Sequence, residues 1–229
     1  MNNDVPTHIG FIVDGNRRWA KEHGLPAYEG HLAGYNAMQD VLLETLHRGV
    51  NYASAYVFST ENWKRSEDEV RRIMKLLRKL LKNDLGMFIE NEVRLRIIGT
   101  EEGLDADIIE LIEAAEEQTK HFKGKELLLC LNYGGQLEIA EAVKKIVQSG
   151  VNPDEVTPEL ISQNLYAPEV PPCDLIVRTS GEKRLSNFML WRAAYSEFMF
   201  LDKNWPEMTK EDVTVILNEY AQRGRRFGG

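Results

Sequence analysis

The chain has 229 residues, 43% hydrophobic and 28% charged, a composition that favours one globular α/β domain spanning residues 1–229. The net charge of −8 disfavours nucleic-acid binding, because an acidic surface repels a phosphate backbone. The two cysteines lack CxxC spacing, and neither a signal peptide nor an apolar run of membrane-spanning length is visible. We therefore predict a cytoplasmic protein with at most peripheral membrane contact.

Apolar runs alternate with amphipathic segments along most of the chain, which is typical of β-α units around a largely parallel sheet. In chain order we predict a strand at residues 8–13, a helix at 32–48, a strand at 52–58, one long helix from Ser66 to Asn91, a strand at 93–98, a helix at 105–121, a strand at 126–131, a helix at 136–148, a short helix opening at Thr157, strands at 175–177 and 198–201, and a helix at 209–222.

Distinctive polar segments follow three of the predicted strands. They are Asp14-Gly15-Asn16, residues 59–65 and residues 178–186. Because ligands bind at the carboxyl ends of strands in open α/β sheets, we expect one site built from these three loops.

The segment that starts at Asp14 offers a carboxylate suited to a hard cation such as Mg²⁺. Gly15 allows close backbone approach, and Arg17 and Arg18 supply donors for phosphate oxygens. The amides that follow could open a helix whose amino end suits an anion. Taken alone, however, Asp14-Gly15-Asn16 is better explained as a capped turn with solvated arginines.

The loop at residues 178–186 places two arginines, a lysine, three hydroxyls and a glycine directly after a strand. These donors match the many acceptor oxygens of a diphosphate. A solvated charge run is the alternative, weakened here because the basic residues alternate with Gly, Ser and Thr. His31 could donate to a phosphate or move a proton, although a lone histidine is more often structural. The cluster at residues 59–63 could equally be an ordinary loop.

Several nucleotide and hydrolase motifs are absent from the sequence. It contains no GxxxxGK[ST], no GxGxxG after a strand, no GxSxG and no DDxxD. P-loop, dinucleotide, α/β-hydrolase and trans-prenyltransferase chemistries are therefore disfavoured.

Nine segments together resemble the cis-prenyltransferase family, typified by undecaprenyl diphosphate synthase. They are HIGFIVDGNRRWA (8–20), GHLAGY (30–35), FSTENWKRS (58–66), RLRIIG (94–99), NYGG (132–135), RTSGEKRLSNFMLW (178–191), YSEFMF (195–200), WP (205–206) and RRFGG (225–229). They occur in the family's order and span essentially the whole chain. The resemblance implies an α/β domain with a hydrophobic product tunnel beside its sheet, acting as a homodimer.

The resemblance also implies the reaction, in which isopentenyl diphosphate is condensed in cis onto a C10–C20 allylic diphosphate with Mg²⁺ as cofactor. It assigns Mg²⁺ to Asp14 and Glu197, and catalysis to Asp14 and Asn62. The allylic diphosphate is assigned to Gly15, Asn16, Arg18 and His31, and isopentenyl diphosphate to Arg178, Arg184 and Ser186. We predict further substrate contacts at Arg17, Trp19, Ser59, Thr60, Glu61, Trp63 and Arg65.

Two further expectations follow from the resemblance. Val57, Leu76, Leu80 and Leu131 would line the tunnel unless they are ordinary core, and residues 225–229 would serve the neighbouring subunit's isopentenyl site. The chain departs from the bacterial pattern, which has glycine where Arg17 stands and arginine where Ala27 stands. Arg17 would then compensate for the missing arginine.

Other functions remain open at this stage. They are a short-chain or irregular prenyltransferase on the same fold, a non-catalytic partner subunit, and a phosphatase or phosphotransferase that uses Asp14. The retained aspartate and basic loop argue against the non-catalytic subunit.

Overall fold

The computed structural model describes residues 5–223. In chain order the elements are β1 (His8–Ile12), α1 (Asn16–Glu22), α2 (Ala27–His47), β2 (Tyr52–Ser59), the 3₁₀ turn η1 (Thr60–Lys64), α3 (Glu67–Asn83), α4 (Leu85–Glu90), β3 (Arg94–Ile98), α5 (Ala106–Thr119), β4 (Glu126–Tyr133), α6 (Gly135–Gln148), η2 (Pro153–Glu155), α7 (Pro158–Asn164), β5 (Leu175–Arg178), β6 (Glu197–Phe200), η3 (Trp205–Glu207) and α8 (Lys210–Gln222).

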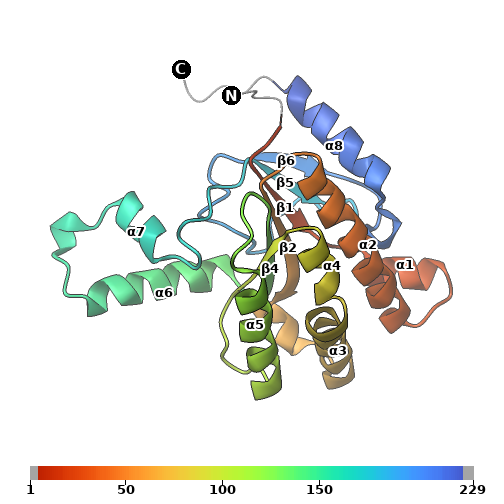
Figure 1. Cartoon of the computed structure of the whole chain (residues 1–229), viewed down its shortest axis with the longest axis horizontal. Coiled ribbons are helices and arrows are strands. Elements are labelled where there is room, and N and C mark those ends of the chain that lie inside the picture. Colours follow the sequence, from red (N-terminus) through yellow and green to blue (C-terminus); the bar gives the residue numbers. More distant parts are fainter. Residues whose placement is uncertain (1–4, 224–229) are drawn as a thin grey trace.

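Within residues 5–223 the strands form one sheet in the order β3-β4-β2-β1-β5-β6, shown in Figure 1. Every neighbouring pair is parallel, so the predicted α/β domain with a largely parallel sheet is confirmed. Because all strands run the same way, their carboxyl ends share one edge, and the loops after β1, β2 and β5 emerge together there.

The central strands are buried on both faces, which explains why they are continuous apolar runs. In β4 every residue is buried. Leu127, Leu129 and Leu131 belong to a core shared with α2, α3, α4, α5 and α8. Leu128 and Cys130 face a second core built with the irregular segment between α7 and β6. The helices therefore cover mainly one face of the sheet.

The predicted single helix from Ser66 to Asn91 is wrong, because the chain breaks at Asp84 into α3 and α4. The amide of Asp84 bonds the carbonyls of Lys79 and Leu80, which ends α3. The Asp84 carboxylate accepts hydrogen bonds from side chains of α2 and α3. Tertiary contacts therefore hold the break. The predicted start of this helix is confirmed, since Ser66 caps α3 and its hydroxyl accepts from the amide of Glu69 at 3.4 Å.

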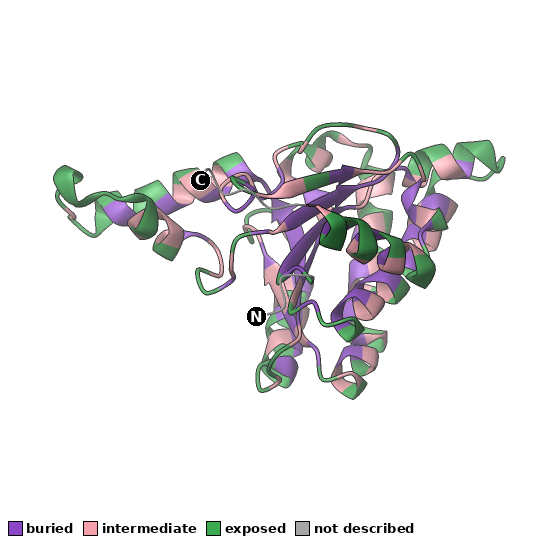
Figure 2. Cartoon of the chain, turned by 90° about the horizontal axis from the view of Figure 1, so that it is seen from above, coloured by how far each residue is buried: buried purple, intermediate pink, exposed green. Residues whose placement is uncertain are grey.

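Helices α6 and α7 form an arm that extends away from the sheet and is largely exposed (Figure 2). A buried ion pair fixes its base, with Arg192 Nη1 2.6 Å from Glu138 Oε1. Within residues 5–223, no helix is both long enough and apolar enough to cross a membrane.

His8 makes the fold sensitive to acid. Its ring is fully buried between Ser54 and the carbonyl of Pro171, at 2.6 and 2.9 Å. Burial lowers the pKa of His8 from its usual 6.5 to about 4. Between those values only the unfolded state binds the proton, so stability is complete above about pH 6.5 and falls as the pH drops toward 4. We expect His8 to account for a loss of about 3 kcal/mol over this window.

Chemical unfolding of the wild type and of His8→Gln at pH 7, 5.5 and 4 measures this contribution. The variant keeps a polar side chain that does not titrate, so the wild type should lose more stability than the variant over the same window. Parallel losses in the two proteins would contradict the assignment.

Candidate active site

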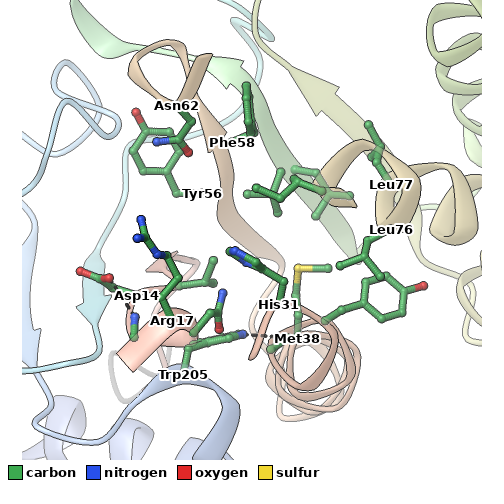
Figure 3. Close-up of a pocket in the computed structure, with 18 of the residues that line it drawn as sticks. Asp14, Arg17, His31, Met38, Tyr56, Phe58, Asn62, Leu76, Leu77 and Trp205 are labelled. Atoms are coloured by element: carbon green, nitrogen blue, oxygen red, sulfur yellow. Dashed lines mark hydrogen bonds between the residues drawn. The ribbon is translucent and has the colours of Figure 1, made fainter. Parts of the chain in front are cut away.

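A cavity of about 400 Å³ opens at the carboxyl edge of the sheet, between the loops after β1 and β2 and helices α2 and α3 (Figure 3). One end is polar and holds Asp14, Arg17 and Asn62. The walls beyond are apolar, and the predicted tunnel residues all lie among them, namely Val57, Leu76, Leu80 and Leu131. The cavity therefore combines a polar head with an apolar pocket, the shape required by an amphiphile.

Asp14 and Arg178 join the first and third predicted loops. Arg178 Nη2 donates to Asp14 Oδ2 at 2.8 Å, and its Nη1 donates to Ser186 Oγ at 2.8 Å and to the carbonyl of Arg184. The Arg178 side chain is 4% exposed, whereas that of Asp14 is 37% exposed. The buried guanidinium therefore fixes a carboxylate that still faces the cavity.

The start of α1 packs unusually closely against α2. A Cβ on Gly30 would lie 2.0 Å from the carbonyl oxygen of Asn16, and one on Gly34 would lie 2.2 Å from Asn16 Oδ1. Gly15 has φ +104°, a conformation that favours glycine, and its amide donates to Asp14 Oδ1 at 2.8 Å. These glycines let Asn16 and Asp14 reach the cavity.

Three basic side chains converge on Glu69. Its carboxylate lies 3.8 Å from Arg17 Nη1, 3.3 Å from His31 Nε2 and 3.0 Å from Arg65 Nη1. Burial lowers the pKa of His31, with Glu69 opposing the shift. His31 is therefore mainly neutral near pH 7 and can donate or accept a hydrogen bond.

Arg18 and Arg184 meet at Glu182. Arg18 Nη1 donates to the carbonyl of Ser180 at 2.6 Å and to the Ser180 hydroxyl, and its Nη2 lies 3.2 Å from Glu182 Oε1. Arg184 pairs with the other carboxylate oxygen of Glu182. Arg18 and Ser180 line the cavity, while the Arg184 side chain is 59% exposed.

The turn after β2 divides into two parts. Asn62 and Arg65 line the cavity. Of the other predicted residues of this turn, Ser59 contacts the turn itself and the remaining three contact neighbouring segments. The amide of Ser59 donates to Asn62, Glu61 accepts from Asn187, Trp63 donates to Asn132, and Thr60 lies against Gly134.

Two predicted residues do not join the others within one chain. Trp19 stacks on His23, with ring centroids 4.3 Å apart. Glu197 opens β6 opposite Leu175, at the amino end of the strand, whereas Asp14 lies beyond the carboxyl end of β1. Glu197 instead pairs with Arg223 at 3.2 Å. The tail at residues 225–229 lies outside the described residues.

Glu69 and Trp205 are among the residues at the site that had no predicted role. Glu69 lies in the first turn of α3, where acidic residues are common because they complement the helix dipole. Trp205 lines the cavity, donates from Nε1 to the carbonyl of Gly34 at 2.9 Å, and its amide bonds the carbonyl of Asp14. Trp205 belongs to the WP motif at 205–206, which matches the family pattern but had been given no function.

A profile of the family described as putative undecaprenyl diphosphate synthase matches residues 12–228. The chain belongs to this family. Over 98% of its length it is 43% identical to an isoprenyl transferase of Thermotoga maritima, covering 97% of that protein. It is also 43% identical, over 98% of this chain and 81% of the relative, to a (2Z,6E)-farnesyl diphosphate-specific trans,polycis-polyprenyl diphosphate synthase of Thermobifida fusca.

Two solved structures share the fold of this undecaprenyl diphosphate synthase family member. One is lavandulyl diphosphate synthase from Lavandula x intermedia with dimethylallyl diphosphate, with TM-score 0.95, 31% identity and 99% of each chain covered. The other is a probable undecaprenyl diphosphate synthase from Campylobacter jejuni, with a TM-score of 0.83 and 34% identity. The match covers 98% of this chain and 99% of that one. The predicted family is thus confirmed, and the protein is a prenyl diphosphate synthase.

Proposed function

We propose that this enzyme condenses isopentenyl diphosphate in cis onto a C10–C20 allylic diphosphate and forms a polyprenyl diphosphate, for a lipid glycan carrier. The observation that carries the proposal is the single cavity that combines a polar end with apolar walls. Arg17, Arg18 and Asn62 line its polar end. A prenyl diphosphate has the same division into an anionic head and an apolar tail.

The chain's own residues suit the charge changes of the reaction. Cleavage of the allylic carbon–oxygen bond leaves negative charge on the departing diphosphate. Donors held beside the departing group stabilise that charge, and the guanidinium groups of Arg17 and Arg18 offer paired donors to phosphate oxygens. The apolar walls exclude water from the carbon that carries positive charge.

The donor set at Asp14 fits Mg²⁺. The Asp14 carboxylate lies at the cavity and is partly exposed. Among residues 5–223, no point gathers three or more His, Cys, Asp or Glu side chains, so within one chain a cation at Asp14 would take its other ligands from water and substrate phosphates. Mg²⁺ characteristically binds in this way, and when bound it would neutralise charge on the diphosphate.

The proposal is tested by incubating the purified protein with labelled isopentenyl diphosphate, Mg²⁺ and C10, C15 or C20 primers, followed by chromatography. A ladder that requires both primer and Mg²⁺ is the expected result. Absence of labelled product with every primer would contradict the proposal, and release of phosphate from a simple ester without the donor would favour a phosphatase.

A second candidate is irregular coupling of two short units, favoured by the TM-score of 0.95 with lavandulyl diphosphate synthase. The same assay with labelled dimethylallyl diphosphate as the only substrate separates the two. A labelled C10 product under that condition would favour irregular coupling.

Arg17 is expected to contribute directly to primer binding. Its side chain is 64% exposed, so the loss in Arg17→Gly should lie at the low end for a charged hydrogen bond, about 1.5 kcal/mol, or roughly a tenfold rise in primer KM. Ala27→Arg added to this variant should restore part of the affinity. Steady-state kinetics with varied primer measure both effects, and an unchanged KM in Arg17→Gly would contradict the role.

We also propose that the enzyme is a cytoplasmic homodimer that meets the membrane peripherally through its product. The supporting observation is Glu197, which the family pattern assigns to Mg²⁺ but which lies far from Asp14 along the strand direction in one chain. A second copy could supply it. Sedimentation at several protein concentrations tests the assembly.

A further inference from the structure

Tyr35 occupies a distinctive place in the cavity wall. It follows His31 by one turn of α2 and lines the cavity together with Met38. Figure 3 shows Met38, Leu76 and Leu77 at the side of the cavity opposite Asp14. Tyr35 is only 6% exposed, so its ring forms part of the apolar wall along which a growing chain would extend.

The hydroxyl of Tyr35 belongs to a polar group at the end of α3, here called the Tyr35 cluster (Tyr35, Gln39, Lys79 and Asp84). Tyr35 donates to Asp84 Oδ2, and Gln39 Nε2 lies 3.1 Å from both the Tyr35 hydroxyl and that oxygen. Lys79 Nζ lies 2.7 Å from the same oxygen and 4.6 Å from the centroid of the Tyr35 ring. The cluster thus ties α2 to the break between α3 and α4.

The cluster reaches from the cavity lining to the surface. Tyr35 lines the cavity, whereas the side chains of Lys79 and Asp84 are 43% and 23% exposed. The ring is therefore the inner surface of the wall, and the ion pair is its outer surface. Removing the ring would extend the cavity between α2 and α3 toward solvent.

The protonation states favour a closed cluster. Burial raises the pKa of Tyr35, and the hydrogen bonds from Lys79 and Tyr35 lower the pKa of Asp84. A neutral hydroxyl therefore donates to an ionised carboxylate near neutral pH. Such charge-assisted hydrogen bonds are stronger than neutral ones.

The volume of the cavity bears on how long a product the enzyme can make. Its volume of about 400 Å³ lies at the small end of the roughly 300–1,000 Å³ typical of ligand pockets, and the polar head of the substrate takes part of it. A chain that grows by five-carbon units soon meets the closed wall.

We propose that the Tyr35 cluster closes the cavity between α2 and the end of α3 and so limits the length of the product. The inference rests on the proposed function. Tyr35 acts as a specificity-determining residue through its ring, while Gln39, Lys79 and Asp84 position that ring.

The test compares the products of Tyr35→Ala, Tyr35→Phe and Asp84→Asn with those of the wild type, using labelled isopentenyl diphosphate, Mg²⁺ and a C15 primer. Tyr35→Ala should shift the main product upward by at least one five-carbon unit. Tyr35→Phe and Asp84→Asn keep the ring but loosen its anchor, so they should give a smaller shift in the same direction.

Tyr166→Phe is the matched control. Like Tyr35→Phe, it removes a tyrosine hydroxyl that donates to a carboxylate, here that of Glu141. Tyr166, however, lies between the α6–α7 arm and the second core and does not line the cavity. Its product ladder should equal that of the wild type. An upward shift as large as that of Tyr35→Phe would overturn the inference, because general loosening would then explain both.

The failure of this inference can be told from failure of the proposed function. If the wild type incorporates no label, the proposed function fails. If it does, and folded Tyr35→Ala gives an identical ladder, the Tyr35 cluster does not limit the chain. Tyr35→Leu serves where Tyr35→Ala does not fold, because it keeps apolar volume but shortens the side chain. An unchanged ladder in that variant overturns the inference equally.

Discussion

Asp14→Ala is expected to lower the rate of prenyl transfer by about 100-fold or more while the protein remains folded. The variant removes the carboxylate through which the cavity would hold Mg²⁺. Charge stabilisation by a metal is worth several kcal/mol, and each 1.36 kcal/mol corresponds to a factor of ten in rate. Single-turnover assays with primer and isopentenyl diphosphate in excess Mg²⁺ measure the loss.

Asp14 also pairs with the buried Arg178, so the alanine variant could lose activity for a structural reason. Asp14→Asn is the control, because its amide oxygen can still accept from Arg178 while the negative charge is gone. A large loss in Asp14→Asn with a melting temperature near that of the wild type supports the metal role. Near-normal, Mg²⁺-dependent turnover in Asp14→Asn would contradict it.

Arg192→Met is expected to destabilise the fold by about 3–5 kcal/mol, because it leaves Glu138 as a buried, unpaired charge. The side chains of Arg192 and Glu138 are 4% and 1% exposed. Arg192 also donates to the carbonyls of Tyr166 and Ala167, which fixes the segment after α7. For a chain of this size the melting temperature should fall by roughly 10 °C.

Arg48→Met provides the comparison, since Arg48 pairs with Glu44 at the end of α2 and its own side chain is 48% exposed. Such surface pairs contribute about 0–1 kcal/mol, so its melting temperature should barely move. Adding Glu138→Leu to Arg192→Met should recover part of the stability, because the uncompensated charge is removed. Equal melting temperatures for Arg48→Met and Arg192→Met would show that the buried pair is unimportant.

The strands and the location of the site could be predicted because both depend on local patterns. Strands buried on both faces must be continuous apolar runs, as in β4, and parallel order brings their following loops to one edge. The pairing of Asp14 with Arg178 follows from that topology, although neither residue alone indicated it.

The features that could not be predicted depend on contacts between distant elements. The apolar period of α3 continues into α4, and the break at Asp84 is held by Tyr35 and Gln39 from α2. Glu69 fits the pattern of an ordinary acidic helix start, and only the folded chain brings Arg17 and His31 to it.

The convergence of Arg17, His31 and Arg65 on Glu69 has a consequence for turnover. An anion that enters this end of the cavity does not meet bare cations but exchanges with a resident carboxylate. Its net affinity is therefore the difference between two sets of contacts. If the diphosphate binds here as proposed, Glu69 would again neutralise the arginines when the inorganic by-product departs, so release would leave no unbalanced positive charge behind. Glu69 would thereby lower the affinity for the diphosphate and speed its release. This suits an enzyme that must empty and refill the same subsite at every added five-carbon unit.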